Sequence, residues 1–193
     1  GIKIASVTGY QAIAIASSGS DTLLASGHGD TLVGGSGSST LSASGDVSAL
    51  IAGAGDNTLI GSGAADSYRF GAGDGQAIII NSSPSNTGPT NELDFGAGIA
   101  EDQLWFEQSG NDLQIELMGT QSRVTVAGWF ASSGSQLQEI TTTDGMKLDS
   151  QVSQLVQAMA TYAANNPGFD PTAVAQVPND QTLQTAIAAS WHQ

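Results

Sequence analysis

The stretch of residues 18–32 reads SGSDTLLASGHGDTL and contains one pattern twice, at a spacing of nine residues. Small residues lead to an Asp, a Thr follows, and a Leu closes the unit. One large apolar residue continues at this spacing over six units: Leu23, Leu32, Leu41, Leu50, Leu59 and Tyr68. This period is that of a repeat and not that of a helix.

A unit of nine residues with one buried side chain suits a short parallel strand followed by a tight turn. Each unit covers too little apolar surface to be stable alone, so the units must stack into a solenoid that buries one continuous row. The small residues on either side of each Asp occupy the expected turns. The sequence therefore predicts a parallel β-solenoid built from the stretch of residues 18–80.

These units resemble the hemolysin-type (RTX) nonapeptide G-G-x-G-x-D-x-U-x. The resemblance implies a right-handed parallel β-roll, in which consecutive units alternate between two sides and the turns bind Ca²⁺. Glycines allow left-handed backbone angles in the turns. The Asp supplies a charged oxygen to a hard cation that takes six or more oxygen ligands. In this family the ion lies between two turns on the same side, so Asp residues two units apart must cooperate.

Only part of this ligand set is present. One side of the roll stacks Asp21, Ser39 and Asn57, and the other stacks Asp30, Ser48 and Asp66. No two neighbouring turns on a side keep the carboxylate, and several Gly-Gly pairs are replaced by Ala-Ser. We expect a roll that has lost most of its calcium dependence. Three residues remain as weak Ca²⁺ ligands: Asp21, Asp30 and Asp66.

The composition excludes several classes of protein. Four Lys and Arg against eighteen Asp and Glu give a formal charge of −14, which repels a phosphate backbone. We therefore expect no nucleic-acid partner. Cysteine is absent, so neither disulfides nor thiol chemistry are available. The chain has no run of roughly twenty apolar residues that would span a membrane, and no cleaved amino-terminal signal is visible.

We divide the chain into three parts: the β-roll at residues 1–80, an antiparallel β cap at 81–148, and a helical tail at 149–193. The first strands include Ile2, Ile4, Ile13 and Ile15, in a degenerate first coil. Because the chain enters in the middle of the pattern, we expect a carboxyl-terminal piece of a longer protein. Residues 61–79 resemble the closing unit of the RTX family, with Ala77 where members usually carry Asp.

The cap begins after a polar loop at residues 81–90. Alternating strands are predicted at 92–95, 104–107, 112–117 and 123–130, and the Asp144-Gly145 pair joins a hairpin of 137–142 with 146–148. Residues 95–130 resemble the calcium-binding-related segment that follows RTX repeats. Its aromatic residues can stack on sugars, but the preference of large aromatics for burial favours a capping role for Trp105, Phe106, Trp129 and Phe130.

Two helices are predicted in the tail. Val152, Leu155, Val156 and Met159 form one apolar stripe, behind Asp149 or Ser150 as a cap. The second stripe is Leu183, Ala186, Ile187 and Trp191, behind Asn179 or Asp180. In RTX proteins the extreme carboxyl terminus carries an uncleaved signal for type I secretion, and the resemblance places that signal from about residue 149 onward.

Catalytic chemistry is not apparent. His28 lies in a repeat turn, but nothing orders the nearby serines into a triad with an oxyanion site. His192 lies one residue from the end, where fraying is expected. Paired carboxylates such as Glu101-Asp102 fall on turns without an apolar pocket to raise a pKa. The Gly-rich runs follow the repeat and lack the Lys of a phosphate-binding loop.

The sequence therefore indicates a non-enzymatic carboxyl-terminal RTX module of a secreted bacterial protein. It supports export by the type I secretion machinery and folds outside the cell, with weakened calcium binding. The alternative is a secreted structural or adhesive protein that forms homo-oligomers, or attaches to a surface, through the β-roll. The low content of charged residues, 11%, motivates this alternative. A third hypothesis is an enzyme domain fused upstream.

Overall fold

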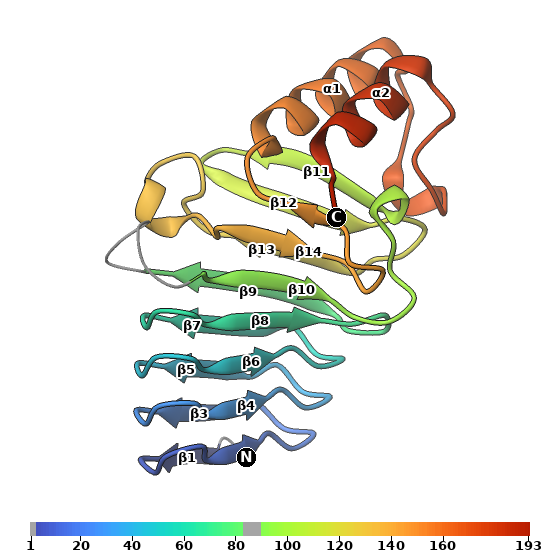
Figure 1. The fold of residues 1–193 in the computed structure, drawn as a ribbon. Coiled ribbons are helices and arrows are strands. Elements are labelled where there is room, and N and C mark those ends of the chain that lie inside the picture. The colour runs from blue at the N-terminus through green and yellow to red at the C-terminus, as the bar shows by residue number, and fades with distance from the viewer. Residues whose placement is uncertain (1–2, 83–89) are drawn as a thin grey trace.

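The computed structural model describes residues 3–82 and 90–193 of the 193-residue chain. Ile2 and most of the polar loop predicted at 81–90 lie outside the described residues. Figure 1 shows a stack of flat β-coils with the amino terminus at one end and two helices at the other.

The stack consists of two sheets. In spatial order, the eight-stranded sheet contains β1 (Lys3–Val7), β3 (Asp21–Ala25), β5 (Thr40–Ala43), β7 (Asn57–Gly61), β9 (Gln76–Asn81), β13 (Arg123–Val126), β12 (Asp112–Leu117) and β11 (Leu104–Ser109). The seven-stranded sheet contains β15 (Lys147–Leu148), β14 (Glu139–Thr141), β10 (Glu92–Phe95), β8 (Ser67–Phe70), β6 (Ala49–Ile51), β4 (Thr31–Val33) and β2 (Ile13–Ile15).

The predicted solenoid is confirmed, because consecutive repeat units pass alternately into the two sheets. Units two apart are parallel neighbours: Leu23 pairs with Leu41 and Leu41 with Leu59 in one sheet. In the other sheet Leu32 pairs with Leu50 and Leu50 with Tyr68. All six residues of the nine-residue series are buried. The two rows face each other and form the core of the roll.

The turns repeat their backbone conformation even where the residue type does not suit it. Gly29 has a φ of 76°, and the residues 18 positions before and after it, Gln11 and Val47, have φ of 54° and 61°. Ala65, a further 18 positions on, has a φ of 59°. A β-branched residue is rare in this left-handed region. The stacked coils therefore impose the turn geometry on Val47.

Close stacking explains the glycines that the repeat retains. A Cβ at Gly27 would overlap the carbonyl oxygen of Gly9 in the preceding coil, and one at Gly45 would overlap the carbonyl oxygen of Gly27. Side chains are excluded here because backbone meets backbone between the coils.

The cap differs in part from the predicted antiparallel arrangement. β11, β12 and β13 are antiparallel to one another, and so are β14 and β15. However, β10, β13 and β14 join the roll as parallel strands, against β8, β9 and β10 respectively. Both sheets of the roll thus continue into the cap. The strand predicted at 123–130 ends at Val126, because Gly128 turns the chain with a φ of 70°.

Both predicted helices are present, as α1 (Val152–Asn165) and α2 (Gln181–Ser190). The Asp180 side chain accepts hydrogen bonds from the backbone N–H groups of Thr182 and Leu183 and so caps α2, as predicted. The cap predicted for α1 is wrong, because Gln151 occupies that position and makes no side-chain cap hydrogen bond. The described residues also contain three short 3-10 helices: η1 (Glu101–Gln103), η2 (Ser133–Ser135) and η3 (Pro171–Ala173).

The helices pack on β11 through aromatic side chains. Trp105, on β11, lies 4.6 Å from Phe169 between ring centroids, and Phe106 lies 6.2 Å from Trp191. Trp105, Phe106 and Trp129 are each at most 5% exposed. Burial to this extent agrees with the capping role predicted for these three residues. The fourth, Phe130, is only partly buried and packs against the core.

Candidate metal-binding turns

The six turn positions that carry the motif's Asp form two columns, one on each side of the roll. The register pairs Asn57 with Ala77 in the eight-stranded sheet, so this column ends on an apolar side chain. All six polar side chains are at most 5% exposed: Asp21, Ser39 and Asn57 in one column, and Asp30, Ser48 and Asp66 in the other. The sequence placed these residues correctly, and the structure shows in addition that they are buried.

Hydrogen bonds join the members of each column across successive coils. The backbone N–H of Ser39 donates to Asn57 Oδ1 at 3.0 Å, and that of Ser48 donates to Asp66 Oδ1 at 2.9 Å. The backbone N–H of Ala12 donates in the same way to Asp30 Oδ1 at 2.9 Å. In each case donor and acceptor lie 18 residues apart, one full coil. We call this set of contacts the polar ladder.

The second polar atom of each ladder residue closes its own turn. Asp30 Oδ2 accepts the backbone N–H of Gly27 at 2.8 Å, and Asp66 Oδ2 accepts that of Gly63 at 3.2 Å. Asn57 Nδ2 donates to the carbonyl oxygens of Gly53 and Gly55 instead. Asp and Asn therefore both close their own turn with hydrogen bonds to the backbone: Asp accepts from N–H groups, and Asn donates to carbonyl oxygens.

The electrostatics of the carboxylates differ between the two columns. Burial raises the pKa of Asp66 to about 6, against the opposing effect of the N–H donors from Ser48 and Gly63. The backbone N–H and the hydroxyl of Ser17 hold the pKa of Asp21 below its usual range. Asp66 is thus a buried carboxylate without a positive partner close enough to offset its desolvation.

The donor set can be tested against the Ca²⁺ that the motif implies. Asp21 Oδ1 is buried and has no hydrogen-bond partner of standard geometry among the described residues, although the backbone N–H of Lys3 also helps to lower the pKa of Asp21. Of the three carboxylates, Asp21 therefore has the oxygen best placed to bind an ion. Its column neighbour in the next coil is Ser39, which supplies a neutral hydroxyl. Both carboxylate oxygens of Asp30 and of Asp66 already accept N–H groups. Within residues 3–82 and 90–193, no three His, Cys, Asp or Glu side chains gather as a possible metal site.

The paired-carboxylate site of the motif is therefore not completed by these residues. Ca²⁺ requires six to eight oxygen ligands, and each neighbouring pair in a column contains one carboxylate at most. Asp21, Asp30 and Asp66 occupy the turn positions that the sequence predicts. Ser48 separates Asp30 from Asp66, and the column of Asp21 contains no second carboxylate.

Asn91 is a ladder residue that the repeat spacing does not reveal. Its Oδ1 accepts the backbone N–H of Asp66 at 2.8 Å, and its Nδ2 donates to Asn81 Oδ1 at 3.0 Å. The Tyr68 hydroxyl donates to the same Asn81 oxygen at 3.1 Å. Asn91 lies 25 residues after Asp66, outside the nine-residue phase. The short polar-apolar alternation that follows Asn91 was the only local signal for a strand here.

The residues that the sequence analysis considered for catalysis make only structural contacts. His28 is exposed and stacks on Tyr10 at 5.2 Å between ring centroids. His192 Nε2 lies 3.5 Å from Asp149 Oδ2 at the protein surface. The side chain of Gln176 donates to Asp102 Oδ2 at 2.9 Å. None of these contacts aligns a nucleophile with a base.

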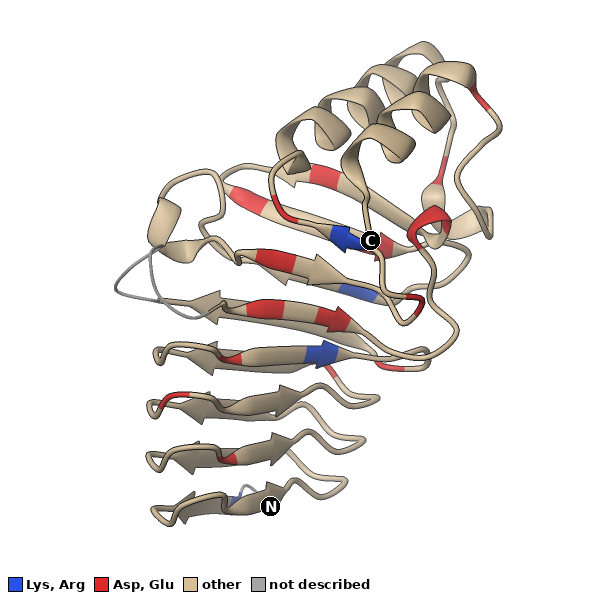
Figure 2. Ribbon diagram, viewed as in Figure 1, with Lys and Arg blue, Asp and Glu red and all other residues tan. Residues whose placement is uncertain are grey.

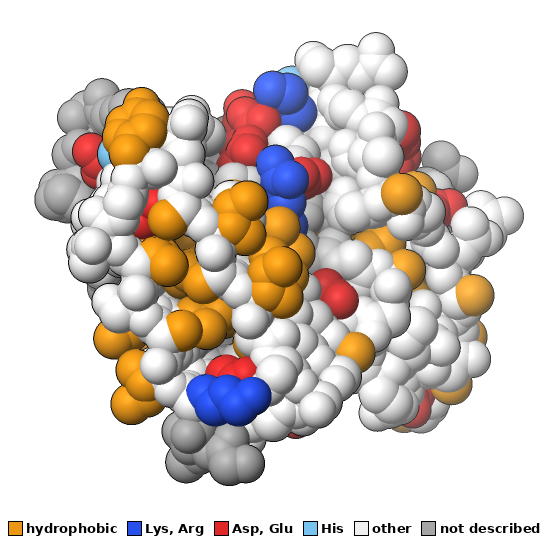
Figure 3. Space-filling model, turned by 90° about the horizontal axis from the view of Figure 1, so that it is seen from below, with side chains coloured by type: hydrophobic (Ala, Val, Ile, Leu, Met, Phe, Trp, Pro, Cys, Tyr) orange, Lys and Arg blue, Asp and Glu red, His pale blue; other side chains and the backbone are white. Residues whose placement is uncertain are grey.

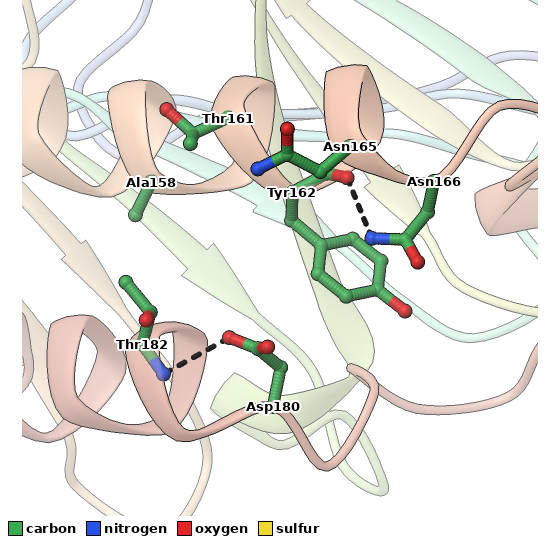
Figure 4. A pocket seen from close by; sticks show the side chains of 7 residues that line it. All are labelled: Ala158, Thr161, Tyr162, Asn165, Asn166, Asp180 and Thr182. Carbon is green, nitrogen blue, oxygen red and sulfur yellow. Dashed lines mark hydrogen bonds between the residues drawn. The ribbon is translucent and has the colours of Figure 1, made fainter.

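The cavity between α1 and α2, of about 100 Å³, is also structural (Figure 4). Asp180 points toward the first turn of α2, where it binds the backbone N–H of Thr182. Asn166 Nδ2 donates to the carbonyl oxygen of Tyr162. These polar side chains of the cavity thus satisfy backbone groups at the ends of the two helices.

In the part of the chain that the structure describes, neither α1 nor α2 has the length and hydrophobicity of a membrane span.

Two alternating parallel sheets, nine-residue units and a polar residue at the same point of every turn define a β-roll of nonapeptide repeats. The family model of the RTX calcium-binding nonapeptide repeat, in four copies, matches residues 13–41 and 49–77. These stretches of the roll are therefore RTX-type calcium-binding nonapeptide repeats. This match covers most of the roll and does not bear on the cap or the helices. The family is a structural, calcium-binding one, and its proteins are typically secreted.

Proposed function

We propose that this chain is a non-enzymatic RTX module of a secreted bacterial protein, which supports export by the type I machinery and folds outside the cell with little help from calcium. The three parts at 1–80, 81–148 and 149–193 then act as roll, cap and export tail. The family relationship supports secretion. The polar ladder supports the reduced role of calcium.

The observation that carries the proposal is the hydrogen bond from Ser39 to Asn57, at a point where the motif requires two carboxylates and an ion. In a complete RTX site, neighbouring carboxylates repel one another until Ca²⁺ binds the folded state and stabilises it. Here neutral side chains remove most of that repulsion, and each ladder hydrogen bond contributes about 1 kcal/mol. The roll is then stable without the ion, and Asp21, Asp30 and Asp66 bind Ca²⁺ weakly.

Circular dichroism in chelator and in millimolar Ca²⁺, with calorimetric titration of the ion, tests this proposal. We expect the strand signal in chelator and little heat on addition of Ca²⁺. Loss of all structure in chelator would refute the calcium-independent roll. Export is tested separately: fusion of residues 149–193 to an unrelated passenger should direct its secretion by a type I system, and failure of export would refute the tail assignment alone.

A second function, self-assembly of a structural or adhesive protein, is favoured by one observation. The strands at the amino-terminal end, β1 and β2, are mostly exposed, whereas the other end is covered by the helices. Size measurement at rising protein concentration separates this function from a monomeric export module.

A further inference from the structure

A pocket of about 540 Å³ lies between α1 and the edge strand β11. β11 is the last strand of the eight-stranded sheet, and among the described residues it pairs only with β12. On its other side lies α1, where Met159 Sδ accepts the backbone N–H of Phe106 at 3.0 Å. Beside this contact, the part of α1 that lines the pocket includes the small residues Ser153, Ala160 and Ala163. Their short side chains leave space between helix and strand.

The walls of this pocket are largely apolar. Trp105 and Phe130 contribute the largest apolar side chains, and Val156 contributes a third from α1. The Trp105 ring is held in place by Tyr162 and Phe169, at 6.1 Å and 4.6 Å between ring centroids. This wall is therefore formed before a ligand arrives. A preformed, mostly apolar pocket of this size, with a few polar groups, is the usual form of a small-molecule site.

Among the described residues that line the pocket, only Glu107 carries a charge. Its side chain is half-buried and makes no hydrogen bond or ion pair with any described residue. Burial raises the pKa of Glu107, and the charge of Glu116 adds to this effect, against the opposing charge of Arg123. Arg123 is itself paired with Glu116, at 3.2 Å between Nη1 and Oε1. Glu107 has thus lost part of its hydration without gaining a partner.

The charges around the pocket favour a cation as its ligand. The chain carries a formal charge of −14, and Figure 2 shows acidic positions on β11 and β12, the strands beneath the helices. α1 contains no charged residue. An anionic ligand would therefore meet Glu107 with no positive side chain on the described walls to offset it. An ammonium group has three N–H donors, which suit Glu107 and the side-chain oxygens of Gln108 and Gln157 on the same walls.

An apolar surface alone would not select a cationic ligand. Hydrophobic side chains also gather at the amino-terminal end of the roll, which Figure 3 views, and Ile4 is 73% exposed there. Residues 3–20 contain no Asp or Glu, so a ligand at that end would gain apolar contact without a carboxylate partner. The pocket beside β11 combines apolar walls with the unpaired carboxylate of Glu107.

We propose that the pocket between β11 and α1 binds a small organic amine in its ammonium form, with the ammonium group on Glu107 and the apolar body against Phe130 and Val156. The ammonium group supplies the charge-assisted hydrogen bond that Glu107 lacks. The apolar body removes the apolar walls of the pocket from water. This site requires neither calcium nor the export tail, and so it lies outside the proposed function.

NMR titration of the 193-residue chain with phenethylammonium chloride, at constant ionic strength, tests the proposal. We expect saturable chemical-shift changes in β11, in α1 and around Phe130. Phenethyl alcohol has the same apolar body without the charge, and it should bind about tenfold more weakly because it makes no charge-assisted hydrogen bond to Glu107. Equal affinities for the two compounds would overturn the proposal, as would shift changes centred on the amino-terminal coil.

Two variants and a matched control locate the site. Glu107→Gln keeps the shape of the side chain and removes its charge, so it should weaken binding of phenethylammonium about tenfold. Ala160→Trp fills the pocket from an exposed position on α1 and should abolish the shift changes. The control is Glu101→Gln, which makes the same chemical change on η1, outside the pocket, and should leave the affinity unchanged.

Circular dichroism of every variant separates loss of binding from loss of folding. A folded chain that shows no saturable change with phenethylammonium overturns the proposal. So does a Glu107→Gln variant that binds as well as Glu101→Gln.

Discussion

The backbone N–H of Ser48 donates a hydrogen bond of 2.9 Å to a carboxylate oxygen of Asp66, one full coil further along the roll. In the RTX motif both positions carry Asp and share an ion. Here a neutral residue and a carboxylate are joined directly through the backbone. The contact shows how a roll can keep the geometry of the calcium-binding turn after half of its carboxylates have been lost.

Ser48→Asp should restore a calcium requirement. The substitution places a carboxylate between Asp30 and Asp66, in a position that is 1% exposed. Without the ion, an unpaired buried charge should lower the free energy of unfolding by about 3 kcal/mol. Millimolar Ca²⁺ should recover the loss and release heat in a titration. The control is Ser42→Asp, which adds the same charge to the outer face of β5. Equal heats from the two variants would contradict the assignment of this column.

Protonation of Asp66 should make the roll more stable as the pH falls from about 6 to about 4 in chelator. The pKa of Asp66 is raised to about 6 in the folded state, so the folded state binds the proton before the unfolded state does. Between that value and the unfolded pKa, its contribution to stability is lost as pH rises, by up to about 1.4 kcal/mol per pH unit.

The Asp66→Asn variant isolates this contribution, because it removes the titrating carboxyl group and keeps the shape of the side chain. Urea unfolding at several pH values should give a difference between the two proteins that changes between pH 4 and 6 and is constant above pH 7. A difference that is independent of pH would show that Asp66 titrates normally.

Val47→Gly should stabilise the protein. Val47 has a φ of 61° and is 49% exposed, so it carries backbone strain and buries little surface. The left-handed conformation costs a residue with a side chain about 1–2 kcal/mol, and glycine avoids this cost. The gain should exceed the larger backbone entropy that glycine loses on folding, so the free energy of unfolding should rise by a few tenths to about 1 kcal/mol. The comparison is Val33→Gly in strand β4, where no positive φ is relieved and stability should fall. A Val47→Gly variant that is as unstable as Val33→Gly would disprove the strain argument.

Asn91→Ala should destabilise the junction between roll and cap. The substitution leaves the backbone N–H of Asp66 without its buried acceptor and removes one of the two donors to Asn81 Oδ1. An unsatisfied buried polar group costs about 1–3 kcal/mol, so we expect a loss of about that size in urea unfolding. Asn166→Ala, which removes an exposed side-chain hydrogen bond just after α1, should change stability by less than about 0.5 kcal/mol. Similar losses in the two variants would contradict the role of Asn91.

The roll was predictable from local signals. Leu32, Leu50 and the other large apolar residues of the series recur every nine residues. Because each unit contributes only one such residue, the units can bury them together only by stacking into a continuous row. The same spacing placed Asp21, Asp30 and Asp66 in equivalent turns and showed that their neighbours in each column are neutral. The two apolar stripes of the tail were likewise enough to locate α1 and α2.

The cap was only partly predictable, because its alternation identified strands and not their neighbours. Residues 92–95 and 123–126 read as members of an antiparallel cap, yet β10 and β13 extend the roll in parallel. Parallel and antiparallel pairing present the same alternation of side chains along one strand. The choice between them depends on which strand of the roll or cap lies beside the new strand in the folded protein, and in which direction the chain then runs.

The sequence by itself determined the nine-residue roll, the two columns of turn residues and the incomplete carboxylate pairs, because each depends on residues at a constant separation. Only the tertiary structure decided that the columns are linked by hydrogen bonds, that Asn91 ends one of them, and that α1 packs on β11. These features depend on contacts between segments whose separation along the chain follows no period, so they exist only once the coils, the cap and the helices have packed.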